Sequence, residues 1–158
     1  MDSRPLPNYK DSPNGEDTFA IGSIYEDHVR WLAENLGFRF RPMTTYAGQI
    51  YTGDFIDQKG RGWEVKFDGT SEKTKRLSIE IAEKTCRDGV KFPSGIFSSS
   101  NAVFYVQGHL TSTWVFYRAE LIDYFNTTKP EVFSFNETVW KFYLPIQQAD
   151  LLAKAKLR

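Results

Sequence analysis

Two carboxylates and a lysine are spaced so that one short hairpin would bring them together. Asp54 lies in a run that ends at Asp57, and Glu64 and Lys66 lie in the run that follows Gly60. A three-residue hairpin loop commonly ends in a residue with positive φ, which suits glycine, and this register sets Asp54 directly opposite Glu64. Directly opposed residues have Cβ atoms roughly 5 Å apart, so the two carboxylates could share one cation. Lys66 lies two residues further along, on the same face of the strand.

A solvated hairpin face would explain the same charges, because an aspartate followed at a distance by Glu-x-Lys recurs by chance. Other features favour a functional site at these charged residues. The register opposes the two acids without adjustment, and opposed like charges destabilise a sheet unless a cation lies between them. A protein that retains such a cost often does so for function. The surrounding residues are large and apolar, which indicates a central hairpin; they are Ile50, Phe55, Ile56, Trp63, Val65 and Phe67.

The segment Gly53-Asp54, followed by Glu64-Val65-Lys66, resembles the core of the PD-(D/E)XK nuclease superfamily. In that core an aspartate ends one strand and a Glu-x-Lys lies on its neighbour. The resemblance covers about residues 23 to 117, and the segments 76–81 and 94–96 are similar to small phage-type and homing-type members. This chain departs from the pattern at Gly53, where the superfamily usually has proline.

The resemblance implies a restriction-endonuclease-like α/β fold, with a mixed β-sheet core flanked by helices. It also implies a metal-dependent DNA endonuclease. Asp54, Glu64 and the Val65 carbonyl would bind Mg²⁺, for which Mn²⁺ could substitute, because phosphodiester hydrolysis uses hard oxygen ligands on a small divalent ion. Lys66 would position the attacking water and offset the charge that builds up in the transition state.

Glu26 has two interpretations. Ser23-x-x-Glu26 is a capping-box pattern, which predicts a helix that starts at Ser23 and stops at Gly37, with Glu26 as its cap. The resemblance instead allows Glu26 to be the extra helix acid that some PD-(D/E)XK enzymes add to the metal site. Glu80, in a strand predicted over 77–82, is a further acid that could support the site or simply face solvent.

Basic residues in two segments could contact the phosphate backbone of DNA. Exposed strand and loop surfaces would explain them equally well. They are Arg39 and Arg41, in the strand predicted over 38–45, and Lys73, Lys75 and Arg76, in the loop predicted over 68–76.

The remaining pattern predicts one domain over 21–158, preceded by a flexible arm over 1–20. A turn-rich connection is expected over 84–101. The two histidines offer no catalytic pair: His28 is expected on a helix surface and His109 in a turn. The predicted elements are a hairpin of strands 102–107 and 110–117 around Gly108-His109, a helix over 118–125, strands over 132–135 and 139–144, and a final helix from Pro145 through Leu157 that carries Lys154 and Lys156 near its end.

Composition limits the class of protein. The 158 residues have a formal net charge of zero and a pI of about 6.7, which counts mildly against a non-specific nucleic-acid binder. One cysteine, Cys86, indicates a reducing compartment. No apolar run is long enough to span a membrane. We therefore expect a cytoplasmic protein of a bacterial or phage-infected cell that does not associate with membranes.

The expected partner is DNA, and a homodimer or higher oligomer is expected because one site cleaves one strand. Two other functions stay open. One is a nucleic-acid-binding or assembly module that keeps the fold without catalysis. The other is a soluble interaction domain whose charged hairpin is merely surface.

Overall fold

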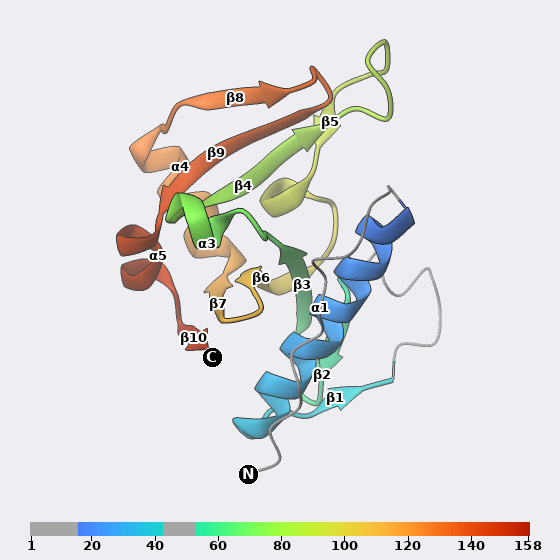
Figure 1. The fold of residues 1–158 in the computed structure, drawn as a ribbon, viewed down its shortest axis with the longest axis vertical. Helices are drawn as coiled ribbons and strands as arrows, with labels where there is room; N and C mark the ends of the chain where they lie inside the picture. Colours follow the sequence, from blue (N-terminus) through green and yellow to red (C-terminus); the bar gives the residue numbers. More distant parts are fainter. Residues whose placement is uncertain (1–15, 43–52) are drawn as a thin grey trace.

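Two β-sheets form the framework of the molecule (Figure 1). The computed structural model describes the backbone of residues 16–42 and 53–158, and the side chains in these ranges from residue 21 onward. The elements in chain order are α1 (Glu16–Asn35), β1 (Phe40–Arg41), β2 (Phe55–Asp57), β3 (Gly62–Phe67), α3 (Ser71–Thr74), β4 (Arg76–Glu83), β5 (Phe92–Pro93), the 3-10 helix η1 (Gly95–Phe97), β6 (Ala102–His109), β7 (Ser112–Tyr117), α4 (Arg118–Thr128), β8 (Val132–Phe135), β9 (Val139–Pro145), α5 (Ile146–Leu152) and β10 (Ala155–Leu157).

Sheet A has the strand order β1-β2-β3-β6-β7-β10. β3 and β6 run parallel, whereas the other neighbouring strands run antiparallel. The fold is therefore α/β with a mixed sheet, as the sequence predicted. α1 crosses this sheet near β3 in Figure 1 and buries Tyr25 and Val29 in one cluster with Trp63 and Val65.

Sheet B is antiparallel, with the order β5-β4-β9-β8. Its inner face carries Leu77, Ile79 and Phe142, which are fully buried. These residues share a second core cluster with Tyr105 of sheet A. α4 covers this core, since the Phe125 ring lies 5.2 Å from that of Phe142.

Strand β6 contributes to both cores, because successive side chains of a strand point to opposite faces. Phe104 and Val106 belong to the cluster with α1, and Tyr105 belongs to the cluster with sheet B. β3 pairs with β6 along its whole length, so the Glu64–Lys66 segment lies in the interior of sheet A rather than at an edge.

The central hairpin has the predicted register. Phe55 pairs with Trp63, and the Asp57 N–H donates to the Arg61 carbonyl at 3.0 Å. Gly60 has the expected positive φ, +79°. The strands predicted over 77–82, 132–135 and 139–144 and the helix over 118–125 are confirmed as β4, β8, β9 and α4. Residues 43–52, which include Ile50 and part of the strand predicted over 38–45, lie outside the described residues, and so do residues 1–15 of the predicted arm.

The predicted start of the first helix is wrong. α1 begins at Glu16, so Ser23 and Glu26 lie inside the helix, and residues 16–20 of the predicted arm are helical. Acidic residues favour a helix N-terminus, and Glu16 and Asp17 supply them. Gly22 is tolerated inside the helix at a cost of about 1 kcal/mol.

Other local expectations fail at chain turns. His109 is in β6 and pairs with Ser112, so the turn lies two residues later than predicted, and both histidines are buried. Gly108 instead allows β6 and β7 to approach closely, since a Cβ there would lie 2.4 Å from the Ser112 carbonyl oxygen. The predicted 68–76 loop contains the single helical turn α3.

The final helix is shorter than predicted. α5 ends at Leu152, and β10 then pairs with β7, burying Leu157. Lys154 and Lys156 consequently do not lie on a helix. Lys156 forms an ion pair with Asp150 at 3.3 Å.

Candidate active site

Two hydrogen bonds to β3 fix Asp54 at the start of β2. Its N–H donates to the Trp63 carbonyl at 2.7 Å, and its Oδ2 accepts the Val65 N–H at 2.8 Å. The regular pairing of β2 with β3 ends at Phe55 and Trp63, and Asp54, just before β2, bonds to the Trp63 carbonyl instead of forming the predicted direct pair with Glu64. The carboxylate is therefore held against the strand that carries the other predicted site residues.

Gly53 provides the bend that delivers Asp54 to this position. Its φ is +93°, and a Cβ at this residue would lie 2.6 Å from the Trp63 carbonyl oxygen. Proline cannot adopt such a conformation, because its ring fixes φ near −65°. The departure from the superfamily pattern at Gly53 thus has a local explanation: here the chain reaches the aspartate by a left-handed bend packed on β3.

Lys66 contacts Glu64 on the same face of β3, with Nζ 3.2 Å from Oε1. Burial alone would lower the pKa of Lys66, but the charges of Glu64 and then Glu80 outweigh this effect and raise it. The ammonium group therefore stays protonated among acids.

Glu26 projects from α1 toward the same cluster. Burial, followed by the charges of Asp54, Asp27 and Glu64, raises the pKa of Glu26 to about 7. Because α1 begins at Glu16, the capping interpretation of Glu26 is wrong. The interpretation as a helix acid beside the hairpin agrees with its position.

Lys66 only partly offsets the effects of burial and neighbouring negative charge on Asp54 and Glu26. Burial and the charge of Glu64 raise the pKa of Asp54 to about 6, although the Val65 N–H and Lys66 act in the opposite direction. Like charges that disfavour ionisation in this way are relieved when a cation lies between them. A solvated hairpin face without a function fits these half-buried, neighbouring acids less well than a site that binds a cation.

Two acids of β4 extend the cluster. The charge of Glu80 helps to raise the pKa of Lys66. Burial, and then the charge of Glu80, raise the pKa of Glu83. A bulge between Glu80 and Ala82 returns Glu83 to the face that Glu80 occupies. The sequence offered Glu80 as a candidate but gave no signal for Glu83, because a bulge is not visible in the alternation of residue types.

Tyr105 is a further residue that the sequence did not reveal. It pairs with Glu64 in the parallel β3–β6 register, so the two side chains share a face. Its hydroxyl is buried and has no hydrogen-bond partner among the described residues. Only the pairing of distant strands brings it to the cluster, which no local pattern predicts.

The donor set suits a hard divalent cation. Mg²⁺ usually keeps several waters and binds one or two carboxylates together with substrate phosphates. Asp54 and Glu64 could supply the carboxylates and Val65 the carbonyl. Within 21–42 and 53–158, no group of three or more His, Cys, Asp or Glu side chains is arranged to hold a metal ion. A cation here would complete its coordination with water and phosphate oxygens.

The predicted phosphate-contacting arginines lie at the loop end of the hairpin, away from Asp54. Arg39 donates to the carbonyls of Glu34 at 3.1 Å and Phe38 at 2.9 Å, at the end of α1. Arg41 donates to the Gln58 carbonyl at 2.7 Å. Both side chains therefore brace the backbone around the loop, and the structure does not bring them to the acidic cluster.

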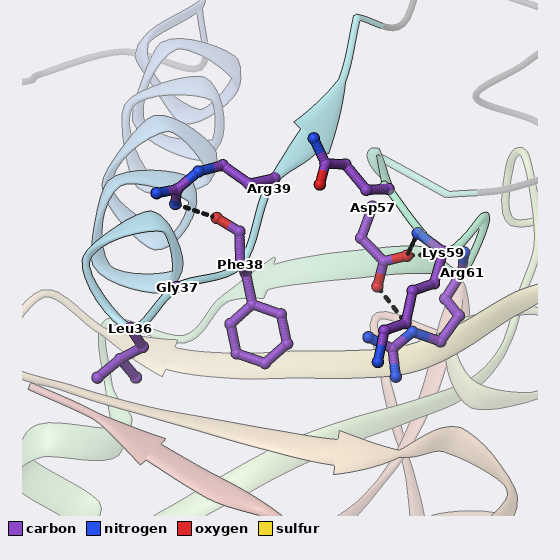
Figure 2. A pocket seen from close by; sticks show the side chains of 8 residues that line it. Leu36, Gly37, Phe38, Arg39, Asp57, Lys59 and Arg61 are labelled. Carbon is purple, nitrogen blue, oxygen red and sulfur yellow. Dashed lines mark hydrogen bonds and ion pairs between the residues drawn. The ribbon is translucent and has the colours of Figure 1, made fainter.

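A pocket of about 250 Å³ lies beside this loop, lined by Arg39, Lys59 and Arg61 (Figure 2). Asp57 faces the same pocket and accepts hydrogen bonds from Arg61 Nε at 2.8 Å and Trp63 Nε1 at 3.1 Å. Burial would raise the pKa of Asp57, but the hydrogen bonds from Arg61 and Trp63 lower it. Asp57 is thus a fully paired acid that fixes the loop, in contrast to Asp54.

The other three predicted phosphate contacts lie in or near the connection from β3 to β4, and all are exposed. Lys73 is in α3, and Lys75 ends this turn with a φ of +57°. Arg76 opens β4 and lies over the Tyr143 ring, 3.5 Å from its centroid.

The chain matches no protein-family model and no curated protein, and its structure matches no solved structure. None of the helices that the structure describes has the length and apolar character needed to cross a bilayer.

Proposed function

We propose that this chain is a metal-dependent DNA endonuclease with a restriction-endonuclease-like fold, acting in a bacterial or phage-infected cell. The observation that carries the proposal is the crowding of Asp54, Glu64 and Glu26 around Lys66. Asp54 directly precedes β2, Glu64 and Lys66 lie on β3, and Glu26 lies on α1. Burial and neighbouring negative charge raise the pKa values of Asp54 and Glu26. The motif resemblance of Gly53-Asp54 and Glu64-Val65-Lys66 supports the same reaction.

Asp54, Glu64 and the Val65 carbonyl would hold Mg²⁺ or Mn²⁺, which when bound supplies Lewis-acid activation of the scissile phosphate and of a water molecule. The chain's own residues do the rest. Lys66, beside Glu64, would orient the attacking water and offset charge on the phosphate. Glu26, with a pKa of about 7, can exchange a proton near neutral pH.

The test is cleavage of mixed plasmid and branched DNA in Mg²⁺, Mn²⁺ or EDTA. Asp54→Asn and Lys66→Met should each reduce metal-dependent cutting at least about 100-fold, because each removes a group that acts on the transition state. Lys129→Met, an exposed lysine after α4, is the matched control and should cut normally. Cutting that persists in Asp54→Asn, or in EDTA, would contradict the assignment.

The alternative is a DNA-binding or assembly module of the same fold without catalysis. The lack of a three-side-chain metal group within the described residues favours it. Tight DNA binding without any Mg²⁺-dependent cutting, on the same substrate panel, would select this function.

One acidic site per chain cleaves one strand, so a double-strand break requires two copies. We therefore propose a homodimer or higher oligomer on DNA. Sedimentation that shows only monomer, with and without DNA, would argue against it.

A further inference from the structure

The outer face of sheet B presents aromatic and basic side chains side by side. Glu80, Lys141 and Phe133 are register partners across β4, β9 and β8, so their side chains point to one face. Tyr143 lies two residues from Lys141, and Phe135 lies two residues from Phe133, so both share this face.

This face is open, whereas the opposite face of the same sheet is core. Phe142, between Lys141 and Tyr143, is completely buried under α4. Phe133, Phe135 and Tyr143 belong to neither core cluster. Phe135 is 42% exposed, and the other two are half-buried. Contiguous apolar groups left open to solvent mark an interaction surface.

Each ring on this face has a neighbour that suits nucleic-acid binding. The Phe133 and Tyr143 rings lie 4.1 Å apart, and the Arg76 guanidinium lies 3.5 Å from the Tyr143 centroid. Lys141 Nζ lies 5.4 Å from the centre of the Phe135 ring. Exposed rings interleaved with cations are the combination that binds single strands, since bases stack on the rings and phosphates meet the cations.

We propose that this face binds an unpaired DNA segment, with bases stacked on Phe133 and Phe135 and phosphates on Arg76 and Lys141. Bases inside a duplex have both faces covered and could not stack on these rings. Glu80 and Glu83 repel phosphates on the β4 side, so the segment is expected over β9 and β8.

The face is continuous with the candidate active site, because Glu80 is both the register partner of Lys141 and a neighbour of Lys66. A DNA substrate with an unpaired arm or bulge could therefore occupy the face while its backbone reaches Asp54. This link to cleavage rests on the proposed endonuclease function, whereas binding to the face does not.

Binding is tested by fluorescence anisotropy in EDTA, so that cleavage cannot contribute. The probes are a labelled oligothymidylate of about twelve nucleotides and a blunt duplex of the same length. We expect the single strand to bind more tightly. Phe135→Ala and Phe133→Ala should each weaken it about fivefold or more, and Lys141→Gln should reduce the slope of log affinity against log salt by about one.

Leu151→Ala, an exposed apolar residue on α5, and Lys129→Gln, an exposed lysine after α4, are the matched controls and should leave binding unchanged. Thermal melting confirms that each variant is folded. Phe135 is the most informative position, because its truncation removes the least buried of the three rings.

Equal binding of both probes, or single-strand binding that is unaffected by Phe135→Ala, would overturn the proposal. If Phe135→Ala changes the sedimentation of the protein but leaves DNA binding unchanged, the proposal is also overturned, and the face contacts a second copy of the chain instead. Mg²⁺-dependent cutting without single-strand binding would refute this inference alone, and single-strand binding without cutting would refute the endonuclease alone.

Discussion

At the scale of single residues, the cluster around Lys66 combines acids that destabilise one another. Asp57 shows the contrast within one hairpin, since its carboxylate is satisfied by Arg61 and Trp63 and its pKa is lowered. Asp54 lies only three residues before Asp57, yet burial and the charge of Glu64 raise its pKa. Such a local electrostatic cost is typical of a binding site for a cation or substrate before its ligand arrives.

The pH dependence of stability follows from these shifts. In the folded protein the pKa is about 6 for Asp54 and about 7 for Glu26, above the ordinary values of 3.8 and 4.5. Between about pH 4 and 7 the folded state therefore binds more protons than the unfolded state, and the free energy of unfolding falls as the pH rises. Asp54→Asn should raise the metal-free free energy of unfolding at pH 8 by about 1 kcal/mol, with the gain vanishing near pH 4.

Urea denaturation at several pH values in EDTA measures this effect. Asp123→Asn, an exposed acid on α4, serves as the control and should change little. Equal free energies of unfolding for wild type and Asp54→Asn at pH 8 would show that the ionised Asp54 carboxylate does not destabilise the fold.

Gly53 supports a second prediction at this scale. Gly53→Ala should lower the free energy of unfolding by about 2–4 kcal/mol, because it adds strain at a positive φ and forces a Cβ against the Trp63 carbonyl. Gly22→Ala in α1 meets no atom within 4 Å and should stabilise the helix by up to about 1 kcal/mol. Chemical denaturation of both variants compares them directly, and a Gly53→Ala protein as stable as wild type would contradict the observed bend.

At the scale of elements, the sequence predicts what depends on neighbours in the chain. The β2–β3 hairpin has the predicted register because loop length and Gly60 determine it locally. The strands β4, β8 and β9 were predictable from the alternation of apolar and polar residues. The sequence thus predicted that Asp54 and Glu64 lie near each other on the hairpin, but not that the Asp54 N–H bonds to the Trp63 carbonyl.

Features that depend on distant segments were not predictable. Tyr105 reaches Glu64 through a parallel pairing between strands, and Glu83 reaches Glu80 through a bulge. The C-terminal residues pair with β7 because Leu157 finds a buried place beside α1, which outweighs the helical pattern of the segment. Tertiary burial, rather than local propensity, decided each of these cases.

β10 allows a test at this scale. Leu157 is 2% exposed, whereas Leu151, on α5, is 80% exposed. Leu157→Ala should cost about 2–4 kcal/mol of stability, and Leu151→Ala less than about 0.5 kcal/mol. Thermal and urea unfolding distinguish the two, and equal losses would contradict the docking of β10 on β7.

At the scale of the whole molecule, the candidate site lies where three layers meet. α1 covers one face of sheet A, and sheet B packs on its other face (Figure 1). Glu26, Glu64 and Glu80 come one from each of these layers. The site therefore depends on the assembled fold, and a variant that loosens either core is expected to separate the acids.

The most direct test of the central claim is calorimetric titration of Mn²⁺ into the metal-free protein at pH 6, where Asp54, with a pKa of about 6, is about half protonated. The account predicts binding of about one ion per chain with release of protons, because carboxyls with raised pKa values must ionise to bind a cation. Asp54→Asn and Glu64→Gln should abolish this binding, and Lys73→Met should preserve it. Absence of binding, or binding that both acid variants retain, would contradict the assignment of Asp54 and Glu64 as a cation site.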